Sequence, residues 1–129
     1  MLYFLLKHIN PKSLRLKYLG WLPLIIWVCI ILGLSFSSFD QAAKYDIPGI
    51  DKVAHFGMFF VLALLAIIQV KRKRLTILNV VVFSIFLAAI TELVQHFFID
   101  NRHGNWLDFL SNLAGLGSGI FLMQHKIKT

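Results

Sequence analysis

Polar side chains recur at helical spacing within three otherwise apolar stretches of the sequence. The pairs are Asp51 and His55, Glu92 and Gln95, and Asp108 and Asn112. Residues three or four apart lie on the same face of an α-helix, so each stretch presents its pair on one face. Carboxylates beside an imidazole are suited to general acid–base chemistry, in which one group takes up a proton and another releases it.

These residues and two nearby cations divide into two predicted roles. The candidate acid and base groups are Glu92, His55 and Asp51. The candidate substrate-binding groups are Lys52, Gln95, Arg102, Asp108 and Asn112. Of these, Arg102 and Lys52 are suited to binding a phosphate or a carboxylate of the ligand.

Other patterns of catalysis or metal binding find little support in the sequence. No G-x-S-x-G nucleophile motif occurs, and Ser111 is the only hydroxyl near the last polar pair. Carboxylates with His55 could hold a metal, but no H-E-x-x-H spacing supports this. The single cysteine, Cys29, cannot build a cysteine-based zinc site within one chain. We therefore expect no metal and no cofactor.

The composition predicts the elements that position these residues. The 129 residues are 58% hydrophobic and 15% charged. A soluble domain of this length cannot bury so much apolar surface, because small globules leave much of their surface in water. A membrane-spanning helix takes about 17–25 apolar residues. The sequence predicts an all-α bundle of four transmembrane helices in a single domain over 1–129, with spans at about 20–39, 53–70, 75–98 and 107–124.

The distribution of charge predicts the topology of the bundle. The net charge is +7, and ten of the thirteen basic residues lie in the N-terminal segment, the loop after the second span and the C-terminus. Basic loops stay in the cytoplasm, so we expect both termini there and an uncleaved first span. The basic excess then reflects orientation, and we expect no binding of nucleic acid.

All six acidic residues fall at or near the outer ends of the predicted spans. Glu92 lies well inside the third predicted span. Six residues separate it from the end of the span at Phe98, which corresponds to about 9 Å of helix. A charge at the helix centre costs about 2.5–3.5 kcal/mol to insert, and somewhat less at this depth, so Glu92 marks a functional site by default. The polar residues thus predict one site at the outer membrane face.

Structural roles compete with this interpretation at several positions. Asp51 and Asp108 are also typical first-turn acids, which suit the helix dipole, and Asn112 is typical of a hydrogen bond between helices. Gly115 and Gly119 form a G-x-x-x-G pattern that favours close helix packing. We expect this pattern to mediate contact with a second copy of the chain.

The polar motifs, taken in order, resemble those of the VanZ-like family of small membrane proteins. The motifs are Asp51-Lys52-x-x-His55-Phe56, Glu92-x-x-Gln95, Arg102, and Asp108-x-x-x-Asn112-x-x-Gly115. The resemblance covers about 33–119 and implies a polytopic helical protein of the bacterial cytoplasmic (inner) membrane. The family takes its name from an accessory protein of low-level resistance to teicoplanin, a lipid-tailed glycopeptide, and its biochemical activity is not settled.

Three functions are compatible with these features. The first is binding or modification of a membrane lipid or a lipid-linked cell-envelope precursor at the outer leaflet, with a link to teicoplanin tolerance implied by the resemblance. The second is a structural or assembly role, in which the polar residues only hold the helices together. The third, ion transport, needs a polar path across the membrane, and the inner half of the third span offers only Asn79 and Ser84.

Overall fold

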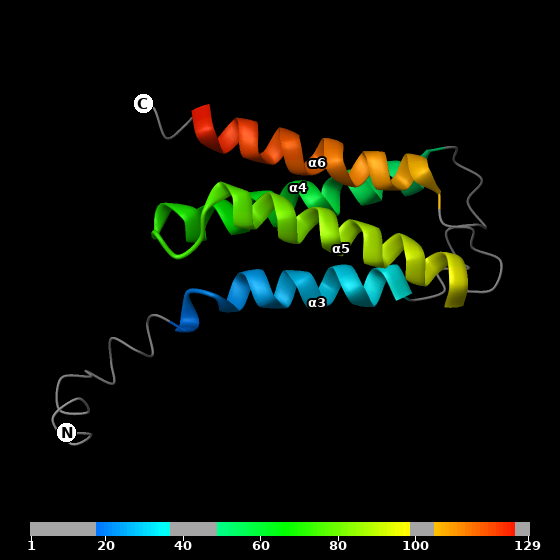
Figure 1. Cartoon of the computed structure of the whole chain (residues 1–129), viewed down its shortest axis with the longest axis horizontal. Helices are drawn as coiled ribbons and strands as arrows, with labels where there is room; N and C mark the ends of the chain where they lie inside the picture. Colours follow the sequence, from blue (N-terminus) through cyan, green and yellow to red (C-terminus); the bar gives the residue numbers. More distant parts are fainter. Residues whose placement is uncertain (1–17, 37–48, 99–104, 126–129) are drawn as a thin grey trace, which may run out of the picture.

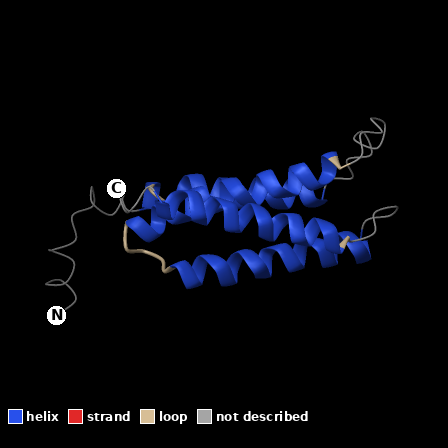
Figure 2. Ribbon diagram, turned by 90° about the horizontal axis from the view of Figure 1, so that it is seen from above, coloured by secondary structure: helices blue, strands red, loops and turns tan. Residues whose placement is uncertain are grey.

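The computed structural model describes residues 18–36, 49–98 and 105–125, and within them every regular element is helical. The helices are α3 (Leu22–Phe36), α4 (Ile50–Lys71), α5 (Ile77–Phe98) and α6 (Trp106–His125). They lie side by side and alternate in direction, so α4 and α6 begin at the end of the bundle where α3 and α5 finish (Figure 1). Figure 2 shows the same lengthwise arrangement from above. The predicted all-α fold is confirmed.

Three of these helices, α4, α5 and α6, are long and apolar enough to cross a membrane, judged by length and composition. The described part of α3 is shorter, at 15 residues. Residues 37–39, which the sequence assigns to the same span, lie outside the described residues. Large hydrophobic side chains such as Phe86, Phe97 and Phe121 are mostly exposed on the bundle exterior, as expected for helices surrounded by lipid.

Local capping explains where two of the helices begin. Gly49 precedes α4 with a φ of 86°, a left-handed conformation that glycine adopts without steric cost. Before α5, the Asn79 N–H donates to Thr76 Oγ1 (3.2 Å) and the Thr76 N–H donates to Asn79 Oδ1 (3.1 Å), as in a capping box. The second helix thus begins at Ile50 rather than near 53, and the third at Ile77 rather than near 75.

The closest pair of helices is α4 and α6, and glycines make this approach possible. A Cβ atom at Gly115 would overlap the backbone carbonyl oxygen of Phe56, and one at Gly119 would lie 2.6 Å from the Cβ atom of Ala63. Both glycines are buried, and their close contact is with α4 of the same chain. A contact with a second copy of the chain stays a prediction.

The core lies along α4, which contacts all three other described helices. Phe59 and Leu62 of α4 pack with Ile31 of α3 and with Leu87 and Ala88 of α5. This apolar centre leaves polar side chains concentrated toward the two ends of the bundle.

Candidate functional site

A cluster of polar side chains lies at the end of the bundle where α4 and α6 begin. We call it the polar cluster, and it consists of Asp51, Lys52 and His55 of α4, Glu92 of α5, and Asp108 and Asn112 of α6. Its members come from the first two turns of α4 and α6 and from the last two turns of α5. The antiparallel order of the helices therefore brings together residues that are distant in the sequence.

His55 is the centre of the polar cluster and is only 2% exposed. Its Nδ1 atom lies 3.1 Å from Oδ1 of Asn112, a hydrogen-bond distance. An amide oxygen can only accept a hydrogen bond, so Nδ1 carries the proton and donates it. The same nitrogen lies 3.7 Å from Oε1 of Glu92, which is too far for a hydrogen bond.

The other ring nitrogen of His55 faces the carboxylate of Asp51 on α4. Nε2 lies 3.7 Å from Oδ1 of Asp51. Donor atoms of Asp51, His55 and Asp108 all lie within 4.8 Å of one another, which makes these three side chains a potential metal-binding group. Lys52 Nζ lies 3.6 Å from Oδ1 of Asp108, so the predicted ligand-binding lysine already has an ion-pair partner within the chain.

Glu92 is tied to the start of α6 by a residue that the sequence analysis missed. The backbone N–H of Asn105 donates to Oε2 of Glu92 at 3.3 Å. The side chain of Asn105 caps α6, because its Oδ1 accepts from the N–H of Leu107 at 3.0 Å. An asparagine directly before an apolar helical run is a recognised N-cap signal, and it could have identified Asn105.

Several buried polar atoms of the cluster have no hydrogen-bond partner among the described residues. They are Oε1 of Glu92, Oδ1 of Asp108 and Nδ2 of Asn112. Asn112 is fully buried, and the side chain of Asp108 is 7% exposed. Buried polar atoms are normally satisfied, so a group of three such atoms around one imidazole indicates a place for a bound ligand or ion.

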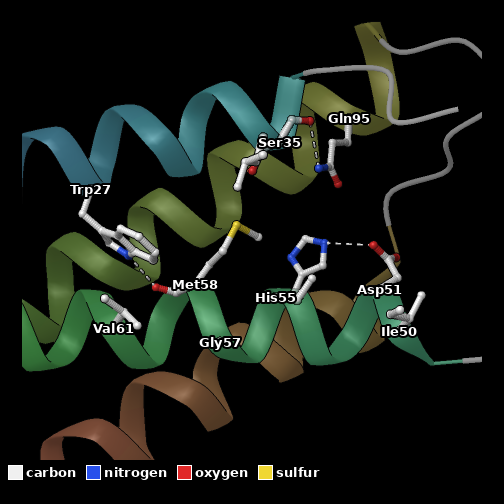
Figure 3. A pocket seen from close by; sticks show the side chains of 11 residues that line it. Trp27, Ser35, Ile50, Asp51, His55, Gly57, Met58, Val61 and Gln95 are labelled. Carbon is white, nitrogen blue, oxygen red and sulfur yellow. Dashed lines mark hydrogen bonds and ion pairs between the residues drawn. The ribbon is translucent and has the colours of Figure 1, made fainter. Parts of the chain in front are cut away.

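An apolar pocket of about 520 Å³ leads away from His55 and Asp51. It lies between α3, α4 and α5, with His55 and Asp51 at one end and Trp27 and Val61 at the other (Figure 3). Trp27 itself is held by a hydrogen bond from Nε1 to the carbonyl oxygen of Met58, at 2.9 Å. The volume is within the range of about 300–1,000 Å³ that is typical of ligand pockets.

The structure brings together most of the predicted site residues. Gln95 differs, because its Nε2 donates to the backbone carbonyl oxygen of Ser35 at 3.0 Å and so links α5 to α3. Gln95 lines the apolar pocket, but its side-chain hydrogen bond among the described residues is to α3 and not to the polar cluster. Arg102, the predicted phosphate-binding cation, lies outside the described residues.

Comparison with known proteins gives one relative. Over 106 residues, the chain is 30% identical to an uncharacterized protein of the fission yeast Schizosaccharomyces pombe. The match covers 79% of this chain, and the chain spans 65% of the length of that relative. No protein-family profile and no solved structure matches the chain. The relative is described only as uncharacterized, so the match transfers no activity.

Proposed function

We propose that this chain is a membrane protein that binds an amphiphile, with the head group at the polar cluster and the acyl chain in the pocket between α3, α4 and α5. The single observation that carries the proposal is the continuity of the two features. His55 and Asp51 belong to the polar cluster and also line the apolar pocket. A ligand that fills both must be polar at one end and apolar along its length.

The surroundings of the pocket favour a lipid chain as the apolar part of the ligand. Three of the helices have the length and composition of membrane spans, and large hydrophobic side chains cover the exterior. The wall near α4 includes Ala54, Gly57, Met58 and Val61, which offer no charge and no strong hydrogen-bonding group. A flexible hydrocarbon chain gains contact with such a wall at little cost in desolvation.

The finer topology belongs to the same proposal. Four spans with both termini in the cytoplasm would put the polar cluster at the outer leaflet, where a lipid-linked cell-envelope precursor presents its head group. The VanZ-like resemblance, a bacterial inner membrane and a role in teicoplanin tolerance stay predictions. The relative is a fungal protein, so the site itself, and not a bacterial envelope, is the basis of the proposal.

Within the site, Glu92 is the group best suited to take up a proton from the bound head group. Its Oε1 is buried and has no hydrogen-bond partner among the described residues, while Oε2 is held by the Asn105 N–H. One oxygen therefore fixes the side chain and the other remains available, as expected for a general base. Arg102 and Lys52 stay predictions as head-group cations, and Lys52 would have to leave Asp108 in order to act.

The unpaired atoms also argue against a role in helix packing alone. A polar network that only holds helices together is most stable when every member is satisfied. Hydrogen bonds between membrane helices contribute only about 0.6 kcal/mol on average, whereas an unsatisfied buried polar group costs about 1–3 kcal/mol. The polar cluster is therefore a poor device for stability and a good one for binding.

The test is to fill the pocket without disturbing the helices. A Cβ atom at Gly57 would meet no heavy atom within 4 Å, so Gly57→Leu places its side chain in open pocket space and also favours the helix. The full chain in detergent is exposed to a fatty acid bearing a diazirine, irradiated and digested for mass spectrometry. We expect labelling near Met58 and Val61 in the wild type, and a reduction of at least about tenfold in Gly57→Leu.

Gly117→Leu is the matched control, because Gly117 is exposed on α6, has the same open space around its Cβ position and does not line the pocket. It should label like the wild type. Equal labelling of the wild type and Gly57→Leu, with both folded by circular dichroism, would refute the proposed acyl-chain site.

A further inference from the structure

We propose that Asp51, His55 and Asp108 bind one divalent metal ion of the Zn²⁺ or Mn²⁺ class at the start of α4 and α6. Their donor atoms all lie within 4.8 Å of one another. The three ligands are one imidazole and two carboxylates, a mixed set that suits these metals. This metal site is distinct from amphiphile binding, because all three metal ligands are side chains of the protein and no lipid is needed to complete them.

The distances around Nε2 of His55 fit an ion better than a direct contact. Nε2 lies 3.7 Å from Oδ1 of Asp51, beyond the range of about 2.7–3.2 Å for a hydrogen bond. Two ligands at about 2.0–2.2 Å from a tetrahedral zinc ion are about 3.4 Å apart. The two atoms therefore need to move only slightly to share a metal between them.

The hydrogen bond on the other side of the ring prepares Nε2 for a metal. Since Nδ1 donates to Asn112, a neutral His55 carries its proton there and directs the lone pair of Nε2 toward the Asp51 carboxylate. A lone pair that faces carboxylate oxygens is repelled unless a cation lies between them. Metal-binding histidines commonly donate their other N–H to an oxygen in this way, which fixes the orientation of the ring.

The charge of the polar cluster also favours a cation. Three carboxylates, those of Asp51, Glu92 and Asp108, lie around His55, and Lys52 pairs with one of them, Asp108. Oδ1 of Asp108 is buried and has no hydrogen-bond donor among the described residues, and the cation paired with it, Lys52 Nζ, lies 3.6 Å away. A divalent ion at Nε2 would compensate this excess and satisfy the Asp108 oxygen.

Three protein ligands leave at least one coordination position of the ion open, as in catalytic metal sites. Asp51 and His55 line the apolar pocket, so this open position borders the place of the proposed head group. That consequence rests on the proposed function, whereas metal binding does not. His55 would then act as a ligand, and Glu92 would remain the group that handles protons.

The experiment measures metal binding directly, with no lipid added. The full chain without an affinity tag is purified in detergent, stripped with a chelator, and titrated with Mn²⁺ by electron paramagnetic resonance and with Zn²⁺ by calorimetry. We expect one ion per chain in the wild type. His55→Ala and Asp108→Asn should each weaken binding at least about tenfold, and Asn112→Ala by about 10–100-fold through the lost orientation of the ring.

Two further variants separate a metal site from general destabilisation. Lys52→Gln should tighten metal binding, because it removes the cation that competes for Asp108. His96→Ala is the matched control for His55→Ala, because His96 is exposed at the same end of the bundle, stacks edge-on with Phe97 and is not one of the three proposed ligands; it should bind like the wild type.

The proposal is overturned if the folded wild type binds neither ion, or if binding persists in both His55→Ala and Asp108→Asn. Should these two variants fail to fold, weaker binding by Lys52→Gln would overturn it equally. Photolabelling of the pocket uses a different probe and a different variant, so failure of the metal site and failure of the amphiphile site are distinguishable.

Discussion

The two ends of the bundle differ in how completely their buried polar side chains are hydrogen-bonded. At the end where α3 begins, Gln69 of α4 is 2% exposed, and both atoms of its amide are paired. Its Nε2 donates to the carbonyl oxygen of Gly20 at 2.7 Å, and its Oε1 accepts from Nη1 of Arg74 at 3.3 Å. At the opposite end, the polar cluster buries a similar amount of polarity but leaves two carboxylate oxygens and an amide nitrogen without hydrogen bonds among the described residues.

This difference separates a structural contact from a binding site. The Gln69 contact joins α4 to the residues before α3, and both polar atoms of its amide are hydrogen-bonded. The polar cluster has unused capacity on Glu92, Asp108 and Asn112, all within reach of one histidine or its partners. Unsatisfied buried groups cost free energy, so a site that keeps them must use them for something other than folding.

The largest expected effect comes from separating α4 from α6, and α6 supplies two members of the polar cluster, Asp108 and Asn112. Gly115→Ala would force a Cβ atom into the backbone of Phe56, where no flexible side chain can yield. We expect a loss of about 3 kcal/mol in stability, seen as a lower midpoint of thermal unfolding in detergent. Gly117→Ala, in open space on the same helix, should instead raise stability by about 0.5–1 kcal/mol. Equal midpoints for the two variants would contradict the α4–α6 contact.

An intermediate effect on stability is expected at the end of the bundle where the buried amide of Gln69 is hydrogen-bonded. Gln69→Ala would remove the short hydrogen bond to the Gly20 carbonyl, which would keep only the longer contact from Arg72 Nη1 at 3.5 Å, and would remove the Oε1 acceptor of Arg74. Thermal unfolding should show a loss of about 1 kcal/mol, within the range measured for hydrogen bonds between membrane helices. Amphiphile labelling should be unchanged, because Gln69 lies at the far end of α4 from Asp51 and His55. Lost labelling in a folded Gln69→Ala protein would abolish the distinction between the two ends.

The smallest effect on stability is expected at the polar cluster, together with the largest effect on function. Glu92→Gln keeps an oxygen that can accept from the Asn105 N–H and removes a buried charge. The free energy of unfolding should stay the same or rise by up to about 1 kcal/mol, seen as an unchanged or higher midpoint of thermal unfolding, since a buried charge without a close partner is costly. Membrane lipid pools in cells that carry Glu92→Gln should resemble those of a deletion strain. A strongly destabilised Glu92→Gln protein would instead favour the packing role.

Much of the fold could be predicted because membrane helices have a strong local signature. Apolar stretches of sufficient length predicted the positions of α4, α5 and α6 to within about three residues, and helical spacing put Asp51 and His55 on one face. The boundaries were less accurate, because they depend on caps at Gly49 and Thr76 that the hydrophobic pattern does not report.

The partners of individual residues could not be predicted in the same way. Gln95 has the same spacing from Glu92 as a cluster member would have, but it turns toward α3 and bonds the Ser35 carbonyl. The glycine pattern of α6 predicted a close helix contact, but it could not say that the contact is with α4 of the same chain. Spacing along one helix defines a face, whereas the neighbour of that face depends on how all the helices pack.

The sequence alone determined that the chain is helical, that it is apolar enough for a membrane, and that acid, base and amide groups lie at the ends of three helices. Only the tertiary structure decided that His55 is surrounded by Asp51, Glu92 and Asn112, and that an apolar pocket starts beside it. The reason is physical. Hydrophobicity and helical periodicity act over neighbouring residues, whereas a site made from three helices depends on side-chain contacts across tens of residues of chain.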